Sequence, residues 1–488
     1  MATTSLPNVL DIAHGFTDPG TLVQFAILES PVTRDENGKV VPQLAESWTE
    51  PDPVTYVFKL REGVVFSDGS PVTAEDVAFS LERHTDPQVA SEAASMVAAV
   101  KSVRATGPDE VTVVLKAPTQ TFLSNVAVMW QVVPKKLAEA HPQDLGTPAF
   151  PTLGTGPYKV TEFSSTKGIT LKPNEKYRGA RPAVGTVKVI TITDPETLRL
   201  AVSSGEVDGT TQVPPRDIRK WAPLKDVRTR FYAGNSIAFL SLNVTYPPLS
   251  DVHVRRAVAH AVNREAMQRL VVGATASPAT TILTHPMLRA LYGDDFRSVT
   301  DRWPRYPYDL AAARDELAKS AYPDGFELPA DYNSGNNTAD ALQVLAADLA
   351  EIGIKLKLNP LPDDTYRANR SRHEGLTLVL NDLSYTTPDP GELLPDLVSS
   401  VGAQPYGFNF AQFTSPRMDT QVDKVLALKN GEERSRVVTG ILTETAEQAP
   451  YVPLYSVDAG IALNKRFTEN VGVWTLNVLA GIKPAESR

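Results

Sequence analysis

Residues 42–48 read PQLAESW, and residues 55–83 read TYVFKLREGVVFSDGSPVTAEDVAFSLER. The run from Val54 to Leu60 alternates and is rich in β-branched and aromatic residues, which predicts a strand. The SDGS that follows predicts a turn. Thr73, with Asp76 three residues later, predicts a capping box that opens a helix reaching the end of this stretch. A strand, a tight turn and a capped helix are therefore expected in close succession.

The same mixture of strands and helices continues along the chain. Pro195 and the residues after it predict a helix that ends at Gly205, a residue suited to the left-handed conformation found after helices. Further helices are expected after Ser250 or Asp251, either of which can cap the first of them, and from Thr338. Further strands are expected at residues 111–116, 186–193, 237–244 and 354–358. Helix and strand share the chain evenly, which favours an α/β or α+β protein with several domains.

Composition excludes several classes of protein. The chain has 488 residues, 48 basic and 57 acidic side chains and a net charge of −9. A net-negative chain is a poor candidate for binding nucleic acid or anionic membranes non-specifically, because both depend on basic side chains. The sequence contains no cysteine. Disulfides, thiolate nucleophiles, zinc fingers and iron–sulfur clusters are therefore excluded.

The sequence shows no clear catalytic, nucleotide-binding or metal-binding motif. Gly154-Thr155-Gly156 lacks the third glycine of a dinucleotide loop and is followed by Pro157, so we interpret it as a structural turn. His253 and His260 lie seven residues apart on one predicted helix, about 10 Å along its axis, which is too far to ligate one ion. The sequence has no HExxH, GxSxG or GxxxxGK[ST] motif. We therefore predict no enzyme, no cofactor and no metal site.

The opening stretch closely resembles the family 5 (cluster C) solute-binding proteins of bacterial ABC importers, which include dipeptide, oligopeptide and nickel binders. The resemblance is strongest from Pro42 to Arg83 and holds in order from about residue 9 to residue 475. It is carried further by GTGPYKV at 154–160, NEKYRG at 174–179, SGEVDG at 204–209, LNVTYPPLSDVHVRRAVAHAVNRE at 242–265, the IGIKLKL segment at 352–358 and the closing YVPLY at 451–455.

The resemblance implies an α/β, periplasmic-binding-protein-like two-lobed fold (type II, cluster C) with an extra inserted lobe and a hinge between the ligand-gripping lobes. A discontinuous lobe I, an inserted lobe II and a lobe III are expected. The expected division is 1–40 for lobe I, 41–153 for lobe II, 154–241 for lobe I again, 242–456 for lobe III and 457–488 for the return to lobe I.

The implied function is capture of a small molecule in an interlobe cleft and delivery to an ABC permease in the membrane. We expect a monomer that binds no nucleic acid and works outside the cytoplasm, lipid-anchored in its full-length precursor. The sequence shows neither a signal peptide nor the lipidated cysteine usual in the family. A trimmed mature form with an added Met1-Ala2 is therefore expected.

One departure from the family pattern concerns the solute. Peptide binders of this family commonly hold the peptide amine with the aspartate of a D-x-x-[DE]-P arrangement. Here the residue four before Pro390 is the neutral Thr386. A buried ammonium needs a carboxylate partner, and Asp382 would supply one if the loop shifts. Peptides therefore stay open beside small non-peptide organics (aromatic or opine-like), oligosaccharides and nickel chelates.

The resemblance points to four places for ligand contacts: the N-terminal loop around 14–18, the polar face of the strand 237–244, the segment 381–386 and the segment 455–458. The predicted ligand-binding residues are His14, Phe16, Asp18, Phe239, Ser241, Asn243, Asn381, Asp382, Tyr385, Thr386 and Tyr455. Phe16 and Tyr385 suit stacking on a ring. Each has a structural alternative, since Phe16 or Phe239 would also suit a core and Asp382 a turn.

Two other functions stay open at this point. A hydrolase with a two-lobed cleft would need a positioned nucleophile–base pair or an acid pair, and the sequence shows no such pattern. A sensory ligand-binding module would use the same fold to signal rather than to import.

Overall fold

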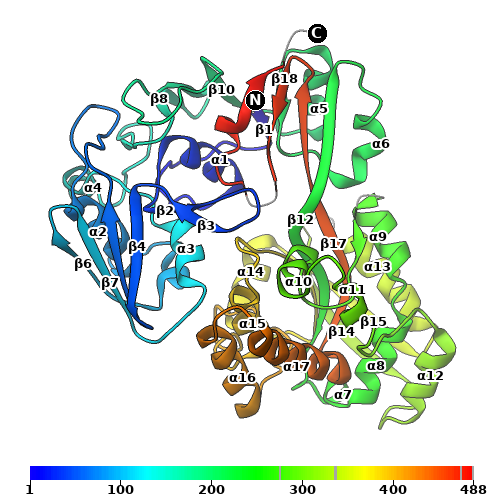
Figure 1. Cartoon of the computed structure of the whole chain (residues 1–488). Helices are drawn as coiled ribbons and strands as arrows, with labels where there is room; N and C mark the ends of the chain where they lie inside the picture. Colours follow the sequence, from blue (N-terminus) through cyan, green and yellow to red (C-terminus); the bar gives the residue numbers. More distant parts are fainter. Residues whose placement is uncertain (274–275, 335–337, 473–474, 486–488) are drawn as a thin grey trace. The chain divides into compact units, whose positions relative to one another are not determined.

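The computed structural model describes residues 1–273, 276–334, 338–472 and 475–485. The chain forms two compact units, each assembled from separate segments. Unit 1 comprises Met1–Val213, Lys220–Arg230 and Gly460–Arg488, and unit 2 comprises Pro214–Arg219 and Phe231–Ala459. Two long strands, β12 (Val227–Leu242) and β17 (Tyr451–Asn464), belong partly to each unit (Figure 1).

Unit 1 contains an antiparallel four-stranded sheet built by the stretch that opens the sequence analysis. Its strands, in the order β4-β5-β7-β6, are β4 (Ala45–Asp52), β5 (Thr55–Leu60), β7 (Glu110–Leu115) and β6 (Val100–Gly107). Helix α2 (Ala74–Glu82) packs against this sheet and begins with the predicted capping box. Thr73 Oγ1 accepts from the Asp76 amide at 3.1 Å, and the Asp76 carboxylate accepts from the Thr73 amide at 2.9 Å. The predicted strand and helix are confirmed.

A second sheet of unit 1 has the order β1-β10-β9-β8. Its strands are β1 (Ala2–Thr3), β10 (Val187–Thr191), β9 (Gly168–Pro173) and β8 (Tyr158–Ser164). The predicted strand at 186–193 is β10, and the predicted helix after it is α5 (Pro195–Ser204), which ends at Gly205 with φ of 79°. The remaining elements of unit 1 are α1 (Asp18–Ile27), β2 (Val32–Arg34), β3 (Val40–Pro42), α3 (Phe122–Met129), α4 (Lys135–Ala140), β11 (Gly209–Thr210), β18 (Phe467–Glu469), β19 (Ile482–Pro484) and the short 3-10 turns Arg83–Thr85, Ala94–Val97 and Leu479–Gly481.

Unit 2 is organised around the paired strands β12 and β16 (Leu378–Ser384), which run antiparallel with Ala238 opposite Asp382. Around them lie α7 (Pro247–Ser250), α8 (Val252–Ala261), α9 (Arg264–Val271), β13 (Ser277–Pro278), α10 (His285–Tyr292), α11 (Arg297–Thr300), α12 (Leu310–Ala318), β14 (Phe326–Asn333), α13 (Thr338–Ala350), β15 (Ile354–Leu361), α14 (Asp363–Arg372), α15 (Pro390–Val398), α16 (Pro416–Ala427) and α17 (Glu432–Gln448). A 3-10 turn (Pro215–Asp217) and α6 (Ile218–Trp221) precede β12. The helices predicted after Asp251 and from Thr338 are α8 and α13.

Both faces of β12 are covered in unit 2. Ala238, Leu240 and Leu242 point into a core shared with α8, α12 and α13. Ile237 and Phe239 point the opposite way, into a second core shared with α10, α15 and α17 (Figure 1). Alternate residues of a strand face opposite sides of the sheet, so a strand that is covered on both sides needs apolar residues at odd-numbered and even-numbered positions alike. The predicted strand at 237–244 is therefore the doubly buried end of a longer strand.

The predicted lobe boundaries were 241/242 and 456/457, whereas the chain passes between the units at 230/231 in β12 and at 459/460 in β17. Hydrophobic patterning marks only the buried end of β12, because the residues before it carry exposed charges typical of a surface strand. Unit 1 contains the residues predicted for lobe II together with most of those predicted for lobe I. The finer division between those two lobes stays a prediction.

Buried ion pairs stabilise each unit internally. In unit 1 the Arg83 guanidinium donates to both oxygens of Asp11, at 3.0 and 2.7 Å, and both side chains are almost fully buried. Next to this pair, burial lowers the pKa of His84 to about 4, with the Arg83 charge contributing in the same direction. His84 is therefore neutral at physiological pH and hydrogen-bonds Ser91 at 2.7 Å.

The turn at Gly154 presses directly on the end of α1. A Cβ on Gly154 would lie 1.9 Å from the carbonyl oxygen of Ile27, a backbone atom that cannot move aside alone. We expect Gly154→Ala to lower the free energy of unfolding by about 2–4 kcal/mol in urea titrations. Gly185→Ala is the matched control, because a Cβ there would meet no atom within 4 Å. Equal stability of the two variants would contradict this account of the turn.

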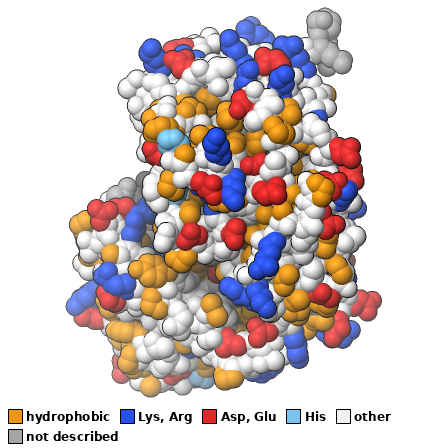
Figure 2. All heavy atoms as spheres, turned by 90° about the vertical axis from the view of Figure 1, so that its left-hand side faces the viewer, with side chains coloured by type: hydrophobic (Ala, Val, Ile, Leu, Met, Phe, Trp, Pro, Cys, Tyr) orange, Lys and Arg blue, Asp and Glu red, His pale blue; other side chains and the backbone are white. Residues whose placement is uncertain are grey.

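Figure 2 shows one face of the molecule, on which acidic and basic side chains are interspersed rather than gathered into a block of one sign. Among the described residues, no helix has the length and apolar character needed to cross a bilayer.

Candidate functional site

Unit 2 presents a carboxylate without a counter-ion at Asp382 on β16. The side chain reaches solvent, and among the described residues it has neither a hydrogen-bond donor nor a cation as partner. Protein around it removes part of its hydration, and this desolvation raises the pKa of the carboxyl to about 6. A carboxylate that is accessible yet partly desolvated gains strongly from a bound cation, because water no longer solvates its charge fully.

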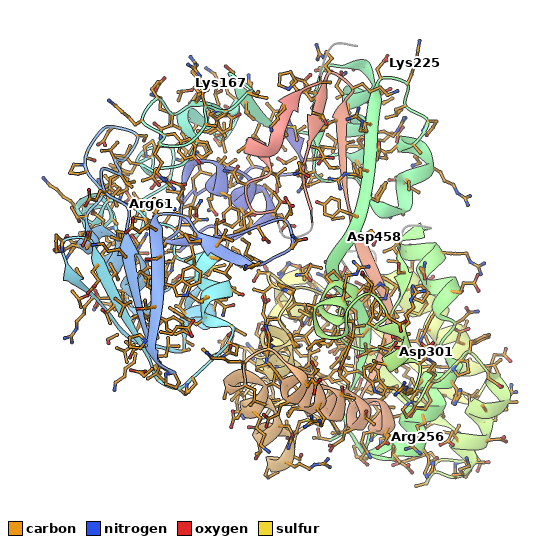
Figure 3. The ribbon with its side chains drawn as sticks, viewed as in Figure 1. Arg61, Lys167, Lys225, Arg256, Asp301 and Asp458 are labelled. Atoms are coloured by element: carbon orange, nitrogen blue, oxygen red, sulfur yellow. The ribbon has the colours of Figure 1, made fainter. Side chains whose placement is uncertain are left out.

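A second unpaired carboxylate lies on β17. Asp458, labelled in Figure 3, accepts a hydrogen bond from the Gly234 amide, and desolvation raises the pKa of its carboxyl to about 6. On the same strand, burial and the nearby charge of Asp382 raise the pKa of Tyr455. The Tyr455 phenol therefore lies within the electrostatic range of Asp382. It stays protonated and can donate a hydrogen bond.

The turn after β16 is fixed by a carboxylate from α15. Glu392 accepts from the amide and hydroxyl of Thr386 at 2.9 and 2.8 Å, and from the amide and hydroxyl of Thr387, both at 2.7 Å. Asp389 is also occupied, because Arg434 donates to its two oxygens at 2.9 and 2.5 Å. Neither Glu392 nor Asp389 is free to hold a ligand cation, which distinguishes both from Asp382.

Several buried polar atoms of unit 2 lack a hydrogen-bond partner among the described residues. They are Nδ2 of Asn235 on β12, the hydroxyl of Tyr385 after β16 and the hydroxyl of Ser456 on β17. Asn235 and Tyr385 are neighbours, since the Tyr385 amide donates to the Asn235 carbonyl at 3.0 Å. Unpartnered buried polar groups are rare in proteins, and a polar ligand or ordered water would satisfy them.

Four of the eight predicted contact residues in unit 2 are buried and engaged by the protein itself. Phe239 is fully buried and packs edge-to-face on Tyr451, with ring centroids 5.4 Å apart. Asn381 donates to the Ser241 hydroxyl at 2.8 Å and accepts from Arg370 at 2.9 Å, and Asn243 donates to the Leu376 carbonyl at 2.7 Å. All four side chains are buried, and the three polar ones are hydrogen-bonded within the protein. We therefore leave Phe239, Ser241, Asn243 and Asn381 out of the proposed contact surface.

The predicted N-terminal contacts lie in unit 1. Asp18 is exposed in the first turn of α1, and Phe16 is partly buried, with its amide donating to the Glu92 carboxylate at 2.8 Å. The His14 ring lies 3.1 Å from the carbonyl oxygen of Pro142. The role of these three residues stays a prediction.

Sequence reasoning missed Asp396 on α15 and Asn235 on β12, whereas Ser456 and Asp458 lie in the predicted segment 455–458. Asp396 is partly buried, and desolvation together with the charge of Glu392 raises the pKa of its carboxyl to about 7. It lies near Tyr385. Burial raises the pKa of the Tyr385 hydroxyl, and the charge of Asp396 raises it further. Only the spacing Glu392-x-x-x-Asp396, which puts two acids on one helix face, could have indicated it.

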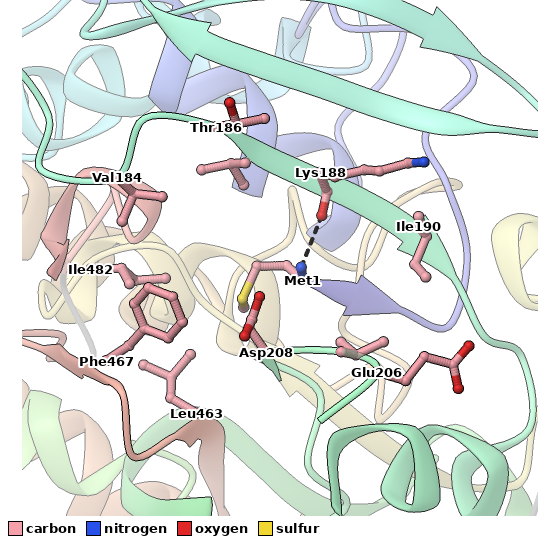
Figure 4. A pocket seen from close by; sticks show the side chains of 12 residues that line it. Met1, Val184, Thr186, Lys188, Ile190, Glu206, Asp208, Leu463, Phe467 and Ile482 are labelled. Atoms are coloured by element: carbon pink, nitrogen blue, oxygen red, sulfur yellow. Dashed lines mark hydrogen bonds between the residues drawn. The ribbon is translucent and has the colours of Figure 1, made fainter. Parts of the chain in front are cut away.

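Figure 4 shows a separate pocket in unit 1, with a volume of about 230 Å³. Its lining is largely apolar, and the Met1 amine within it donates to the Lys188 carbonyl at 2.8 Å. None of the predicted ligand-binding residues lines it. Among the described residues, no three His, Cys, Asp or Glu side chains are grouped so that they could hold a metal ion.

Comparison with known proteins identifies the family. Residues 39–405 match the family described as bacterial extracellular solute-binding proteins, family 5 Middle, which is most of the chain. The chain belongs to the family 5 solute-binding proteins. The resemblance noted in the sequence and the predicted solute-binding function are confirmed, and the family's receptors bind solutes outside the cytoplasm for ABC importers.

Individual relatives are similar over nearly the whole chain. The glutathione-binding protein GsiB of Salmonella paratyphi A is 26% identical over 452 residues, covering 91% of this chain and 85% of the relative. DppA of Helicobacter pylori in complex with the peptide STSA has a TM-score of 0.82 at 22% identity, covering 99% and 97% of the two chains. NikA of Brucella suis in complex with Fe(III)-EDTA has a TM-score of 0.85 at 23% identity, covering 99% of both. These structural likenesses confirm the predicted α/β, periplasmic-binding-protein-like fold.

Proposed function

We propose that this family 5 receptor captures a small organic solute bearing a protonated amine, with a peptide or peptide-like compound as its class, and that Asp382 is the anion that pairs with the amine. The observation that carries the proposal is the lack of any counter-ion for the accessible Asp382 carboxylate among the described residues of unit 2. Delivery to a membrane permease follows from the family.

Charge is the first support. The carboxylates of Asp382, Asp396 and Asp458 all have raised pKa values through desolvation, and no ion pair involves any of them among the described residues. Each carboxylate is costly to keep ionised where it lies, and a cation supplied by the solute would repay that cost. An anionic solute would add repulsion instead.

Hydrogen-bonding capacity is the second support. Tyr455 and Ser456 on β17 and Tyr385 after β16 offer hydroxyls, and Asn235 on the intervening strand β12 offers an amide. Amide and carboxyl oxygens of a peptide accept from such donors. GsiB by name binds glutathione and DppA holds a peptide, and both ligands contain an amine and amide groups.

This assignment changes how the missing family aspartate is interpreted. Thr386, which stands where peptide binders carry an acid, is bound to Glu392 through its amide and hydroxyl. Asp382 lies four residues earlier and is unpaired. We infer that the anionic anchor has moved from the turn to the strand that precedes it.

Paired ligands test the proposal. We expect glutathione or a tripeptide to raise the melting temperature of the protein, and the same compound with its amine acetylated to leave it unchanged. At a concentration 100 times Kd, a ligand adds about 2.7 kcal/mol to the free energy of unfolding, which a thermal-shift assay detects. Equal shifts from the free and acetylated forms, or shifts from sugars and aromatic acids alone, would contradict the amine assignment.

A further inference from the structure

A second cavity lies wholly within unit 2, and none of the three unpaired carboxylates lines it. Its volume is about 640 Å³, enough for a small organic molecule. Its walls come from the start of α9, the segment after β13, the loop before α12 and the inner face of α17. Its apolar surface is provided by Ala279, Ile282, Leu442, Pro453 and the ring of Tyr451.

Arg264 supplies a fixed positive charge to this cavity. Its Nε donates to the Pro453 carbonyl at 2.8 Å, and Nη1 donates to the carbonyls of Tyr306 at 2.8 Å and Ala259 at 3.1 Å. Among the described residues, Nη2 has no hydrogen-bond partner and the guanidinium has no carboxylate partner. Desolvation lowers the pKa of Arg264 to about 10, so it remains charged at neutral pH.

The rim of the cavity adds two more arginines. Arg269 pairs with Glu265 at 3.0 Å, and both side chains are largely exposed. Arg305 pairs with Asp301, which Figure 3 labels, again with both side chains exposed. Exposed ion pairs of this kind contribute little to stability and break easily, so both arginine side chains can turn toward a bound anion. Three arginines and one glutamate line the cavity of a chain whose net charge is −9.

Neutral donors complete the lining. The hydroxyls of Thr280 and Thr281 have no hydrogen-bond partner among the described residues, and Tyr308 exposes its ring at the rim. A carboxylate oxygen can accept from the free Nη2 of Arg264, and an apolar body matches the surface formed by Ile282, Leu442 and Tyr451. The lining therefore suits a molecule with one anionic end and one apolar end.

We propose that this cavity is a second ligand site, distinct from the amine site around Asp382, and that it binds a small organic carboxylate through Arg264, with Arg269 and Arg305 adding attraction at the rim. The two sites select opposite charges within one unit, because one is lined by unpaired carboxylates and the other by arginines.

Isothermal titration of the full chain with benzoate and with succinate tests the site. We expect binding to the wild-type protein, with the Kd raised more than about tenfold in the variant Arg269→Glu/Arg305→Glu. The matched control is Arg314→Glu/Arg417→Glu, which makes the same change of net charge at exposed arginines of unit 2 outside the cavity. The control should bind as the wild type does.

Two further variants keep the outcome unambiguous. Arg264→Lys retains the charge but loses the Nη2 donor, and we expect it to weaken binding of both carboxylates while the far-ultraviolet circular dichroism stays unchanged. Asp382→Asn should leave benzoate binding intact, which separates this site from the amine site. The proposal is overturned if wild-type protein binds neither carboxylate at about 20 mM, far above a 1 mM Kd, or if the rim variant and its control bind equally.

Discussion

Asp382→Asn is expected to weaken binding of an amine-bearing solute by about tenfold to 150-fold. A hydrogen bond to a charged group contributes about 1.5–3 kcal/mol, and each 1.4 kcal/mol is a factor of ten in Kd. The amide keeps the size and shape of the side chain but removes its charge. Titration calorimetry with glutathione or a tripeptide measures the loss, and Glu316→Gln, at an acid already paired with Lys319 and His253 elsewhere in unit 2, is the control.

The dependence on pH gives this prediction a second readout. The pKa of Asp382 is about 6 without solute, so its carboxyl is ionised at pH 7.5 and about nine-tenths protonated at pH 5. The solute amine needs the ionised form. Affinity should therefore fall about tenfold from pH 7.5 to pH 5, and more steeply if Asp458, with a similar pKa, also contacts the amine. In Asp382→Asn this fall should shrink, and a slope identical to that of the wild type would contradict the assignment.

Stability should move in the opposite direction. The folded-state pKa of Asp382 lies above its ordinary value of 3.8, so folding favours the protonated carboxyl. Its contribution to stability is fully present below about pH 4 and is lost as the pH rises through about 6. Without solute, Asp382→Asn should therefore be at least as stable as the wild type at pH 7.5, and this advantage should disappear toward pH 4. Urea titrations at both pH values measure the difference.

The sequence predicted well where the signal is local. The capping box of Thr73 and Asp76, the glycine after α5 and a cap for α8 at Ser250 or Asp251 all depend on residues within a few positions. The structure contains each of them, with Asp251 as the cap of α8. The capping box lies within the family signature, between Pro42 and Arg83. Patterns of this kind can be predicted because the backbone groups they satisfy belong to the same turn of chain.

The prediction for the 237–244 strand was less complete, for a physical reason. Ser241 and Asn243 made one face of that strand look polar, which favoured contact with a solute. In the structure Asn381 donates to the Ser241 hydroxyl from the neighbouring strand, Asn243 donates to the Leu376 carbonyl, and both side chains are buried. A polar residue in a strand indicates that a hydrogen bond is needed, and its sequence neighbours do not show whether the partner is protein or ligand.

The segment 382–392 contains three acids, and their partners elsewhere in the fold determine which of them lacks a counter-ion. The segment contains Asp382, Asp389 and Glu392. Asp389 is neutralised by Arg434, 45 residues later in the chain, and Glu392 folds back on the turn before it. Only Asp382 is left without a partner among the described residues. Sequence alone could place three candidate anions close together, and the tertiary pairing selected one.

The ion pair between Arg434 and Asp389 leads to the prediction with the largest effect on stability. The Arg434 side chain is 1% exposed and that of Asp389 is 11% exposed. The guanidinium also donates to the Val425 carbonyl at 2.7 Å and to Asn430 at 2.6 Å. Asp389 in turn caps α15 by accepting from the Gly391 amide at 2.7 Å. One arginine thus links α16, α17 and the start of α15.

Arg434→Ala should lower the free energy of unfolding by about 3–5 kcal/mol, because it leaves a buried carboxylate and a buried carbonyl without their partner. The control is Arg417→Ala, whose 3.2 Å pair with Glu444 is exposed on the arginine side and should contribute less than about 1 kcal/mol. Urea unfolding followed by fluorescence compares the two. Similar losses in both would show that burial does not set the strength of the pair.

The double variant Arg434→Met/Asp389→Asn distinguishes the cost of an unpaired charge from the worth of the pair. Asparagine still caps a helix, and methionine fills much of the arginine volume, so we expect it to recover a large part of the stability lost in Arg434→Ala. Solute affinity should respond differently. Because Asp389 directly follows the Thr386–Pro388 turn and the cap is retained, the double variant should bind an amine-bearing solute more tightly than Arg434→Ala does. Recovery of stability without recovery of affinity would mean that Arg434 itself orients the turn, beyond satisfying the charge of Asp389.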